Sequence, residues 1–567
     1  MRNDRTSIRN RRAVAAPVGL GALSGVLAGL AALAIAELVS AAVRPQAGPV
    51  VAVGAAAIDR TPAAVKDWAI RNFGTNDKLV LQAGILAVLA LLALFLGIAA
   101  LRFRRAGVAG VLLFGLVGAV AAATRPDASG PPDTVPSLAG AVAGAAVLYA
   151  LVGRLTVRRR SAASSGGPEQ EQEQEREQGR ARGREQDQDQ ERGRGRGRER
   201  GQDEGWDRRG FVIAASAAAA ASFGAGGLGR VLKGSAAQDA TASRERVLLP
   251  APGSPAAPLP KGTQLRVPGV SPFVTPHNSF YRVDTALVVP RVDATTWRLR
   301  IHGRGVIRPL TLTYDDLLRR ELVERDITLT CVSNEVGGPY VGNARWTGVR
   351  LAELLAECGV RAPSLGGPAD QLVARSVDGM TLGSPVEDVM DGRDALLALG
   401  MNGEPLPFDH GFPVRMVVPG LYGFVSACKW IESIELTTFD AYDPYWVQRG
   451  WARRAPVKTQ SRIDTPRPFA RPRAGTVMVA GVAWAQRRGI DRVEVRVDDG
   501  PWQRARLATE ASRDTWRQWS FPWQATPGGH TLTVRATDRT GAVQTQQRTK
   551  TVPDGASGWH SVVVTVE

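Results

Sequence analysis

Long apolar segments separated by short charged ones fill the first part of the chain. Four of them are each bounded by charges or prolines, at residues 12–44, 79–101, 106–123 and 135–153. Each is close in length to the ~20 residues that a helix needs to cross a bilayer core. Glycine and alanine are frequent in them, as expected where membrane helices pack closely. The pattern predicts a four-helix membrane domain over residues 1–157.

The second half of the chain has two other patterns. From about residue 266 to 440, short alternating runs such as TWRLRIHG and DITLTCVS are mixed with helix-like patches such as YDDLLRREL and LAELLAECG. Nearer the end, alternating runs are separated by the turn signals DDGP and PGGH, without a helical period. We predict an α+β domain over 266–440, then a connector and an immunoglobulin-like β-sandwich over 441–567. The fold class is therefore multi-domain, with an α-helical membrane domain first.

Between these halves lies a segment, residues 158–208, that consists almost entirely of Ser, Gly, Glu, Gln, Asp and Arg. Its composition predicts a disordered charged linker. RG repeats can bind RNA, but the interleaved acidic residues neutralise this one. About twenty small or apolar residues follow and predict a fifth membrane helix over 209–232. A linker rich in Pro, Ala and Gly is expected over 233–265.

The start of the fifth helix resembles a twin-arginine export signal. Arg208 and Arg209 form the pair, and Phe211 and Val212 are the apolar residues after it. An ordinary membrane helix flanked by positive charges explains the segment equally well. No alanine-rich cleavage box decides whether the helix is removed, so we treat it as an anchor.

Positive charges predict the orientation of the membrane domain. Arginines cluster before the first span, between the second and third spans, and after the fourth, whereas the alternate loops are mixed or acidic. By the positive-inside rule, the N-terminus is cytoplasmic, and the region after the fifth helix is extracytoplasmic. We therefore expect a multi-pass protein of the cell membrane. Glu37, inside the first span, is either a functional membrane carboxylate or an interface residue near a helix end.

Composition excludes several classes of protein. The net charge of +17 comes from 71 basic and 54 acidic residues, but the surplus is spread along the chain, which argues against nucleic acid as a partner. Three cysteines without a CxxC motif exclude a disulfide framework and a structural zinc site of the usual spacing. All five histidines follow residue 276, so no histidine pair in the first four spans can hold b-haem.

The chemistry is expected in the α+β domain. Cys331 ends the apolar run DITLT and opens the polar turn CVSNEVGG, which predicts a sulfur at the carboxyl edge of a strand. A lone cysteine is more often a small core residue. His410 and Arg415 flank a Gly-Phe-Pro turn, and the planar fork of an arginine suits a phosphate. Cys358, just before a helix-ending glycine, is interpreted as structural, and Cys428 is left open.

A third polar segment, TPHNSFYR, places Asn278, Tyr281 and Arg282 in a proline-led loop. Together with the strand-end cysteine and the blocks GNARWTGVRLAELL and DHGFPVRMVVPG, it resembles the sulfite-oxidase family of molybdopterin enzymes. The similarity covers about 266–440, and the sandwich after it matches the dimerisation domain of many members. Membrane spans followed by an exported enzyme also resemble the membrane-bound actinobacterial members.

The resemblance implies a molybdenum–molybdopterin cofactor. Cys331 falls where the family supplies its single thiolate to the metal, which makes it the expected metal ligand and catalytic residue. Trp346 is expected to pack near the pocket, and Arg415 suits the pterin phosphate. The implied cofactor-binding residues are Asn278, Tyr281, Arg282, Ser376, His410, Arg415, Ser426, Ala427 and Cys428.

The sequence departs from sulfite oxidases where these bind the sulfite dianion. They carry arginines shortly after the cysteine, whereas Asn334, Glu335 and Val336 stand here. Their tyrosine near the metal aligns with Trp451, although Tyr445 lies nearby in the sequence. Because a carboxylate repels sulfite, the sequence favours a sulfoxide or an N-oxide as the substrate.

The implied function is two-electron oxo transfer, on the extracytoplasmic side, to or from a small-molecule oxo acceptor or donor. The chain has no CxxCH haem motif and no iron–sulfur cysteine set, so electrons must pass through an unidentified partner, a quinone or a redox protein. The membrane domain is then either an anchor or a docking site for that partner, and a homodimer through the sandwich is left open. The alternative is a non-enzymatic cell-surface receptor or adhesion protein.

Overall fold

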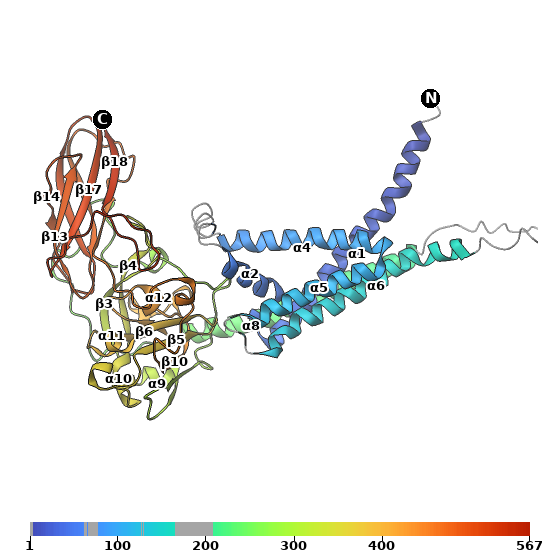
Figure 1. Ribbon diagram of the computed structural model, residues 1–567, viewed down its shortest axis with the longest axis horizontal. Helices are drawn as coiled ribbons and strands as arrows, with labels where there is room; N and C mark the ends of the chain where they lie inside the picture. The colour runs from blue at the N-terminus through green and yellow to red at the C-terminus, as the bar shows by residue number, and fades with distance from the viewer. Residues whose placement is uncertain (1–3, 62–64, 66–76, 126–127, 129, 165–207) are drawn as a thin grey trace, which may run out of the picture. The chain divides into compact units, whose positions relative to one another are not determined.

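The structure is a computed structural model that describes residues 4–61, 65, 77–125, 128, 130–164 and 208–567. Residues 165–207, most of the predicted charged linker, lie outside the described residues. The chain forms two compact units, Met1–Gly234 and Ser235–Glu567 (Figure 1).

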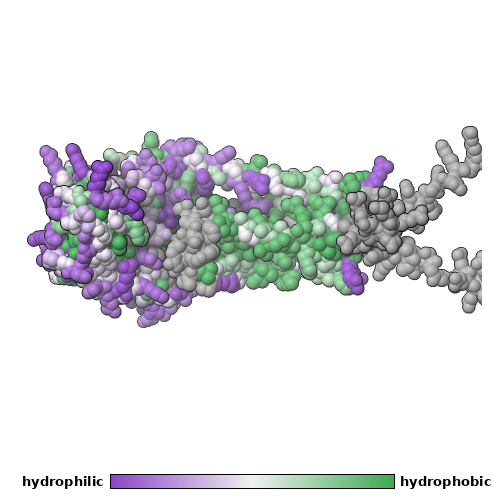
Figure 2. All heavy atoms as spheres, turned by 90° about the horizontal axis from the view of Figure 1, so that it is seen from above, coloured by the Kyte–Doolittle hydropathy of each residue, from purple (hydrophilic) through white to green (hydrophobic). Residues whose placement is uncertain are grey.

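The first unit is helical. Its α-helices are α1 (Asp4–Val43), α2 (Pro49–Arg60), α4 (Asp77–Arg102), α5 (Arg104–Ala123), α6 (Val135–Ser164) and the first part of α8 (Arg208–Glu245). Five stretches are long and apolar enough to cross a membrane: Val18–Val43, Leu79–Arg102, Arg104–Ala123, Pro131–Leu155 and Arg209–Glu245. Hydrophobic residues dominate the visible surface of these helices (Figure 2). The predicted apolar helices are therefore confirmed.

Small residues let these helices approach closely. A Cβ atom added to Gly25 of α1 would lie 1.9 Å from the carbonyl oxygen of Ala93 in α4. One added to Gly140 of α6 would lie 2.4 Å from the carbonyl oxygen of Ala32 in α1. Because no side chain fits at either crossing, the glycine and alanine content of the spans serves helix packing.

Two helix boundaries differ from the prediction, and one helix is additional to it. The fourth predicted span continues to Ser164, so residues 158–164 of the expected linker are helical. The helix α2 lies in the loop after the first span and begins at Pro49, whose fixed φ suits the first turn of a helix. The helix α8 continues past residue 232 to Glu245, because the alanine-rich segment after Lys233 favours helix and contains no proline. Glu37 of α1 forms an ion pair with Lys233 of α8.

The second unit begins with two five-stranded sheets. One has the order β2-β1-β10-β5-β6, and the other has the order β3-β4-β7-β8, with β9 paired to β7. Their strands are β1 (Arg298–Gly303), β2 (Leu310–Thr313), β3 (Val323–Thr330), β4 (Val341–Arg350), β5 (Gln371–Ser376), β6 (Thr381–Pro385), β7 (Leu396–Met401), β8 (Glu404–Pro405), β9 (Arg415–Val417) and β10 (Ile431–Thr437). Short helices lie between them: α9 (Tyr314–Leu318), α10 (Leu351–Glu357), α11 (Val386–Met390) and α12 (Gly423–Ser426). The predicted mixture of strands and helices is confirmed.

Two four-stranded sheets follow, ordered β11-β12-β16-β15 and β14-β13-β17-β18. Their strands are β11 (Gln460–Thr465), β12 (Gly475–Trp484), β13 (Ile490–Val497), β14 (Gln503–Arg504), β15 (Arg506–Leu507), β16 (Arg517–Ala525), β17 (Gly528–Asp538) and β18 (His560–Val566). Val479 and Trp519 of the first sheet share one buried cluster with Val493 and Leu532 of the second. The two sheets therefore pack face to face as a sandwich.

The sandwich is joined to the rest of the second unit. Trp516 is buried in the hydrophobic core of the α+β domain, and its indole N–H donates to the carbonyl oxygen of Phe273 (2.9 Å). The expected linker over 233–265 is fixed as well: the carbonyl of Ser254 accepts from Glu324 N (2.9 Å), and Leu265 N donates to Gln518 Oε1 (2.6 Å). This segment is therefore not a free tether, and the α+β domain and the sandwich form one body.

Candidate active site

Cys331 is the first residue after β3, as the sequence predicted. It opens the segment 331–340, called the cysteine loop below. The loop is closed by its own hydrogen bonds: Cys331 N donates to Tyr340 O (2.9 Å), and Tyr340 N donates to Asn334 Oδ1 (2.8 Å). Asn334, which stands in the segment where sulfite oxidases carry arginines, is thus a buried structural residue of this loop.

The thiol of Cys331 is buried, with 7% of the residue exposed. Burial raises the pKa of this thiol, while hydrogen bonds from Ser333 and the charge of Lys429 oppose the rise. The thiol is therefore neutral until a metal displaces its proton, and the nearby cation favours the thiolate that results.

Lys429 is a site residue that sequence reasoning missed. Its ammonium group pairs with Asp284 (2.7 Å) and donates to the carbonyl oxygen of Asp409 (3.1 Å). Both side chains of the ion pair are less than 10% exposed. A lysine directly after the apolar run VSAC was the available signal, because a buried lysine requires a partner.

Tyr281 lies beside the strand end that carries Cys331. A Cβ atom added to Gly423, the first residue of α12, would lie 3.6 Å from Thr330 O and 3.8 Å from the Tyr281 hydroxyl. Burial, and then the charge of Cys331, raise the pKa of Tyr281, whereas Arg415 lowers it. The tyrosine is therefore a neutral hydrogen-bonding group near the thiol.

His410 and Arg415 flank the predicted turn. Gly411 allows the turn with a φ of +111°, and Arg415 is the first residue of β9. The His410 Nε2–H donates to the carbonyl oxygen of His277 (3.0 Å), which fixes the short turn that carries Asn278.

Arg415 is buried with unused hydrogen-bonding capacity. One Nη donates to the carbonyl oxygen of His410 (3.3 Å), and the guanidinium carbon lies 5.2 Å from the ring centre of the fully buried Trp346. Its Nε is buried and has no hydrogen-bond partner among the described residues. Burial lowers the pKa of this guanidinium. A buried cation with an unused donor is suited to bind an anion such as a phosphate.

Three other predicted cofactor residues differ in their exposure. Asn278 and Arg282 are exposed, and Arg282 pairs with Asp409 (3.2 Å). Ser376 is buried at the end of β5, next to Val377, whose N–H donates to Trp430 O (3.0 Å).

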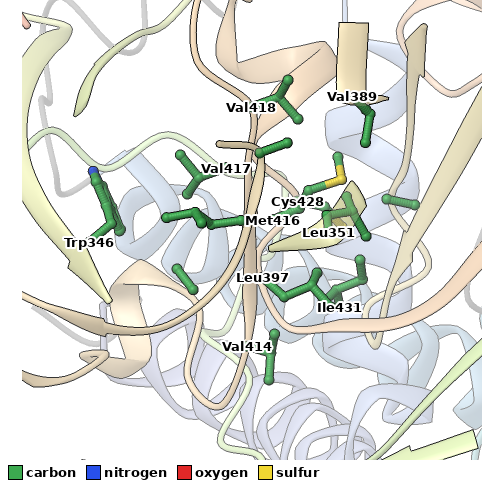
Figure 3. Packing of buried hydrophobic residues seen from close by; sticks show 14 of the residues in the cluster. Trp346, Leu351, Val389, Leu397, Val414, Met416, Val417, Val418, Cys428 and Ile431 are labelled. Atoms are coloured by element: carbon green, nitrogen blue, oxygen red, sulfur yellow. The ribbon is translucent and has the colours of Figure 1, made fainter. Parts of the chain in front are cut away.

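The side chain of Cys428, which the sequence left open, belongs to the core. Figure 3 shows it among buried hydrophobic residues that include Leu351, Val389 and Ile431. Burial raises the pKa of its thiol. The backbone of the segment Ser426, Ala427 and Cys428 instead lies along β9, because Met416 N donates to Cys428 O (2.9 Å). The thiol is also near enough to Arg415 for the guanidinium to oppose the rise in the pKa of Cys428.

The donor set suits one particular kind of metal centre. Within the described residues, no group of three or more His, Cys, Asp and Glu side chains could hold a metal ion. A metal that takes most of its ligands from an organic cofactor needs only one soft protein ligand, and Cys331 supplies it. The unpaired Nε of Arg415 suits a phosphate of such a cofactor, so the residues present fit a pterin-bound metal.

His410 gives the site a pH dependence. Burial, with further effects from Arg415 and Lys429, lowers the pKa of His410 to about 4. Between pH 6.5, the ordinary pKa of histidine, and pH 4, the unfolded chain therefore binds more protons at this position than the folded chain does. The free energy of unfolding falls as the pH drops through this range, by about 2–3 kcal/mol from His410 alone. We expect His410→Gln to flatten the decline of the thermal midpoint over this range. Part of the pH dependence of the thermal midpoint should remain in this variant, because burial also lowers the pKa of His560 to about 4. If the pH dependence is the same in His410→Gln as in the original chain, His410 is not its source.

Comparison with known proteins gives a consistent result. Residues 286–446 match the family described as "Oxidoreductase molybdopterin binding domain". Mitochondrial sulfite oxidase of Rattus norvegicus is 31% identical over 293 residues, which cover 44% of this chain and 53% of that protein. The chain therefore spans about half the length of such curated relatives. The uncharacterized oxidoreductase YuiH of Bacillus subtilis is 32% identical over 162 residues, which cover 29% of this chain and 75% of that protein.

Among solved structures, the sulfane dehydrogenase SoxCD from Paracoccus pantotrophus aligns with 53% of this chain and 84% of its own. The sequence identity is 26% and the TM-score is 0.45.

Proposed function

We propose that this chain, which belongs to the sulfite-oxidase family of molybdopterin oxidoreductases, is a membrane-anchored enzyme of two-electron oxo transfer. The observation that carries the proposal is a buried thiol at a strand end and a buried arginine with an unused donor, both of which influence the pKa of Tyr281. When bound, molybdenum–molybdopterin supplies a centre that exchanges an oxygen atom and two electrons with a substrate.

The residues of the chain have separate roles in this proposal. Cys331 binds the metal as a thiolate, and Lys429 stabilises that negative charge. Arg415 binds the phosphate of the pterin, and Tyr281 offers a neutral hydroxyl beside the thiol. His410 is neutral at pH 7 and holds the turn with Asn278 in place. Ser426 to Cys428 present their backbone to the cofactor, while Arg282 and Ser376 support the edges of the site.

The proposed substrate is a sulfoxide or an N-oxide rather than sulfite. Two cations of the site are already paired with carboxylates: the Lys429 ammonium with Asp284, and the Arg282 guanidinium with Asp409. Glu335 is an exposed carboxylate of the cysteine loop. The loop therefore adds negative charge near the site, which disfavours a dianionic substrate and tolerates a neutral or cationic one.

Membrane attachment completes the proposal. Five apolar helices suit a multi-pass anchor, and the distribution of arginines supports an extracytoplasmic location for the second unit. The twin-arginine-like start of α8 is consistent with export of a folded cofactor domain. We further propose that the sandwich is immunoglobulin-like and can support a homodimer, and that a quinone or a redox protein exchanges electrons with the site.

Metal and pterin content test the proposal directly. The full chain, produced in detergent from cells that make molybdopterin, is expected to carry stoichiometric molybdenum by elemental analysis. It should reduce sulfoxides or N-oxides with an artificial electron donor faster than it oxidises sulfite with an artificial acceptor. A folded chain without molybdenum or pterin would instead support the cell-surface receptor alternative. Faster sulfite oxidation would overturn the substrate assignment alone.

Glu335→Arg is expected to shift the substrate preference. Reversing this charge should raise kcat/KM for sulfite about tenfold and lower it for a cationic N-oxide, because both effects are electrostatic. Both should weaken at high salt. Glu321→Arg is the matched control, since Glu321 is also exposed but precedes the other end of β3. Equal changes in the two variants would refute a local role for Glu335.

A further inference from the structure

The cysteine loop is held from outside by an arginine of the sandwich. Arg462, on β11, donates from one Nη to the carbonyl oxygen of Gly338 (2.9 Å). Its Nε donates to Asp464 (2.6 Å), and its other Nη donates to the Ser271 hydroxyl (2.9 Å). All three nitrogens of the guanidinium are therefore used, and the side chain is 11% exposed. Such a fork has little freedom to move.

A histidine of the sandwich covers the neighbouring loop residue. His560, at the start of β18, accepts a hydrogen bond from Ile463 N through Nδ1 (3.0 Å). Its ring lies so close to Gly337 that a Cβ atom added there would be 2.2 Å from Cδ2. Gly337 has a φ of +81°, which favours glycine independently. The turn of the cysteine loop is thus fitted closely against the sandwich.

The strand that leads to Cys331 is held in the same way. Gln486, which follows β12, donates from Nε2 to the carbonyl oxygen of Thr328 (3.0 Å). Trp516 N donates to the Thr328 hydroxyl (2.7 Å). The sandwich therefore contacts the chain both before and after Cys331.

We propose that Arg462 is a positioning residue for Cys331, and that the sandwich serves the site by holding the cysteine loop in its closed conformation. Each contact on the loop comes from a different strand of the sandwich: Arg462 from β11 and His560 from β18. Loss of the Arg462 side chain removes the hydrogen bond from the sandwich to the carbonyl oxygen of Gly338. The inference concerns the thiol itself and does not require the proposed cofactor or substrate.

The rate at which Cys331 reacts in cofactor-free full chain tests this inference. Iodoacetamide labelling, followed by peptide mass spectrometry, gives separate rates for each cysteine. In Arg462→Met we expect Cys331 to be labelled about tenfold faster, because the loop opens more often once a hydrogen bond to a charged group is lost. The fully buried Cys358 serves as an internal reference for global unfolding, and its rate should not change.

Arg488→Met is the matched control. Arg488 is another arginine of the sandwich, bonded to Asp538 (2.9 Å) and to the carbonyl oxygen of Val457 (2.8 Å), but not to the cysteine loop. The Arg488→Met variant should leave the ratio of the Cys331 labelling rate to the Cys358 labelling rate unchanged. An unchanged Cys331 rate in Arg462→Met, or an equal rise for both cysteines, would overturn the proposal.

A second variant covers the case in which Arg462→Met does not fold. His560→Ala removes the ring over Gly337 and should also raise the labelling of Cys331 relative to Cys358. In the cofactor-loaded chain, Arg462→Met should alter the electron paramagnetic resonance spectrum of the one-electron-reduced metal, which a purely structural role elsewhere would not do. Because the labelling needs no cofactor, its failure is distinguishable from a failure of the proposed function.

Discussion

Cys331→Ser is expected to reduce bound molybdenum by at least tenfold, to about background, because a serine hydroxyl is a hard ligand that stays protonated near neutral pH. The substitution keeps the shape of the side chain, so the fold should be retained. The thermal midpoint of the cofactor-free chain is expected to change little, since Cys331 follows the last residue of β3 and is not part of the hydrophobic core cluster. Elemental analysis and a thermal scan of the same preparations measure both quantities.

Cys358→Ser is the control for this prediction. Cys358 is fully buried, caps α10 and accepts hydrogen bonds from Ile307 and Arg308 through its carbonyl oxygen. Replacing its thiol should lower the thermal midpoint, because a hydroxyl enters an apolar site, while molybdenum content per folded chain stays unchanged. Stoichiometric molybdenum in Cys331→Ser would contradict the assignment of Cys331 as the metal ligand.

Local sequence pattern was sufficient for the features that depend on neighbouring residues. The alternation in DITLT and the polar turn after it placed Cys331 at a strand end, because the side-chain period of a strand is visible in a few residues. The Gly-Phe-Pro turn between His410 and Arg415 was visible for the same reason. The apolar spans needed only length and composition.

Contacts between distant segments could not be predicted in this way. The ion pair of Lys429 with Asp284 and the bond from Arg462 to Gly338 each join residues far apart in the chain. Nothing in either local sequence specifies the partner. Cys428 shows the same limit: its position in a turn after a glycine is local, but the direction of its thiol depends on how β9 and the core pack around it.

Two buried arginines of the second unit differ in how well their charge is satisfied. Arg393 donates to Asp388 (2.6 Å), Asp391 (2.7 Å) and the carbonyl oxygen of Pro419 (3.1 Å). Within the part of the chain that the structure describes, Arg415 donates to the carbonyl oxygen of His410 and has an unused Nε. The first arrangement stabilises the fold, whereas the second keeps a buried charge available, which is typical of a binding site.

The pair Arg415→Met and Arg393→Met separates these two roles. Arg415→Met should leave the cofactor-free chain as stable as before or stabilise it by about 1 kcal/mol, since it removes a poorly paired buried charge. It should lower the molybdopterin content about tenfold or more, because a charge-assisted hydrogen bond to phosphate is lost. Arg393→Met should destabilise the chain by about 2–3 kcal/mol, yet leave the content per folded chain unchanged. If Arg415→Met instead destabilises the cofactor-free chain as strongly as Arg393→Met, the Arg415 charge serves the fold and the phosphate must be bound elsewhere.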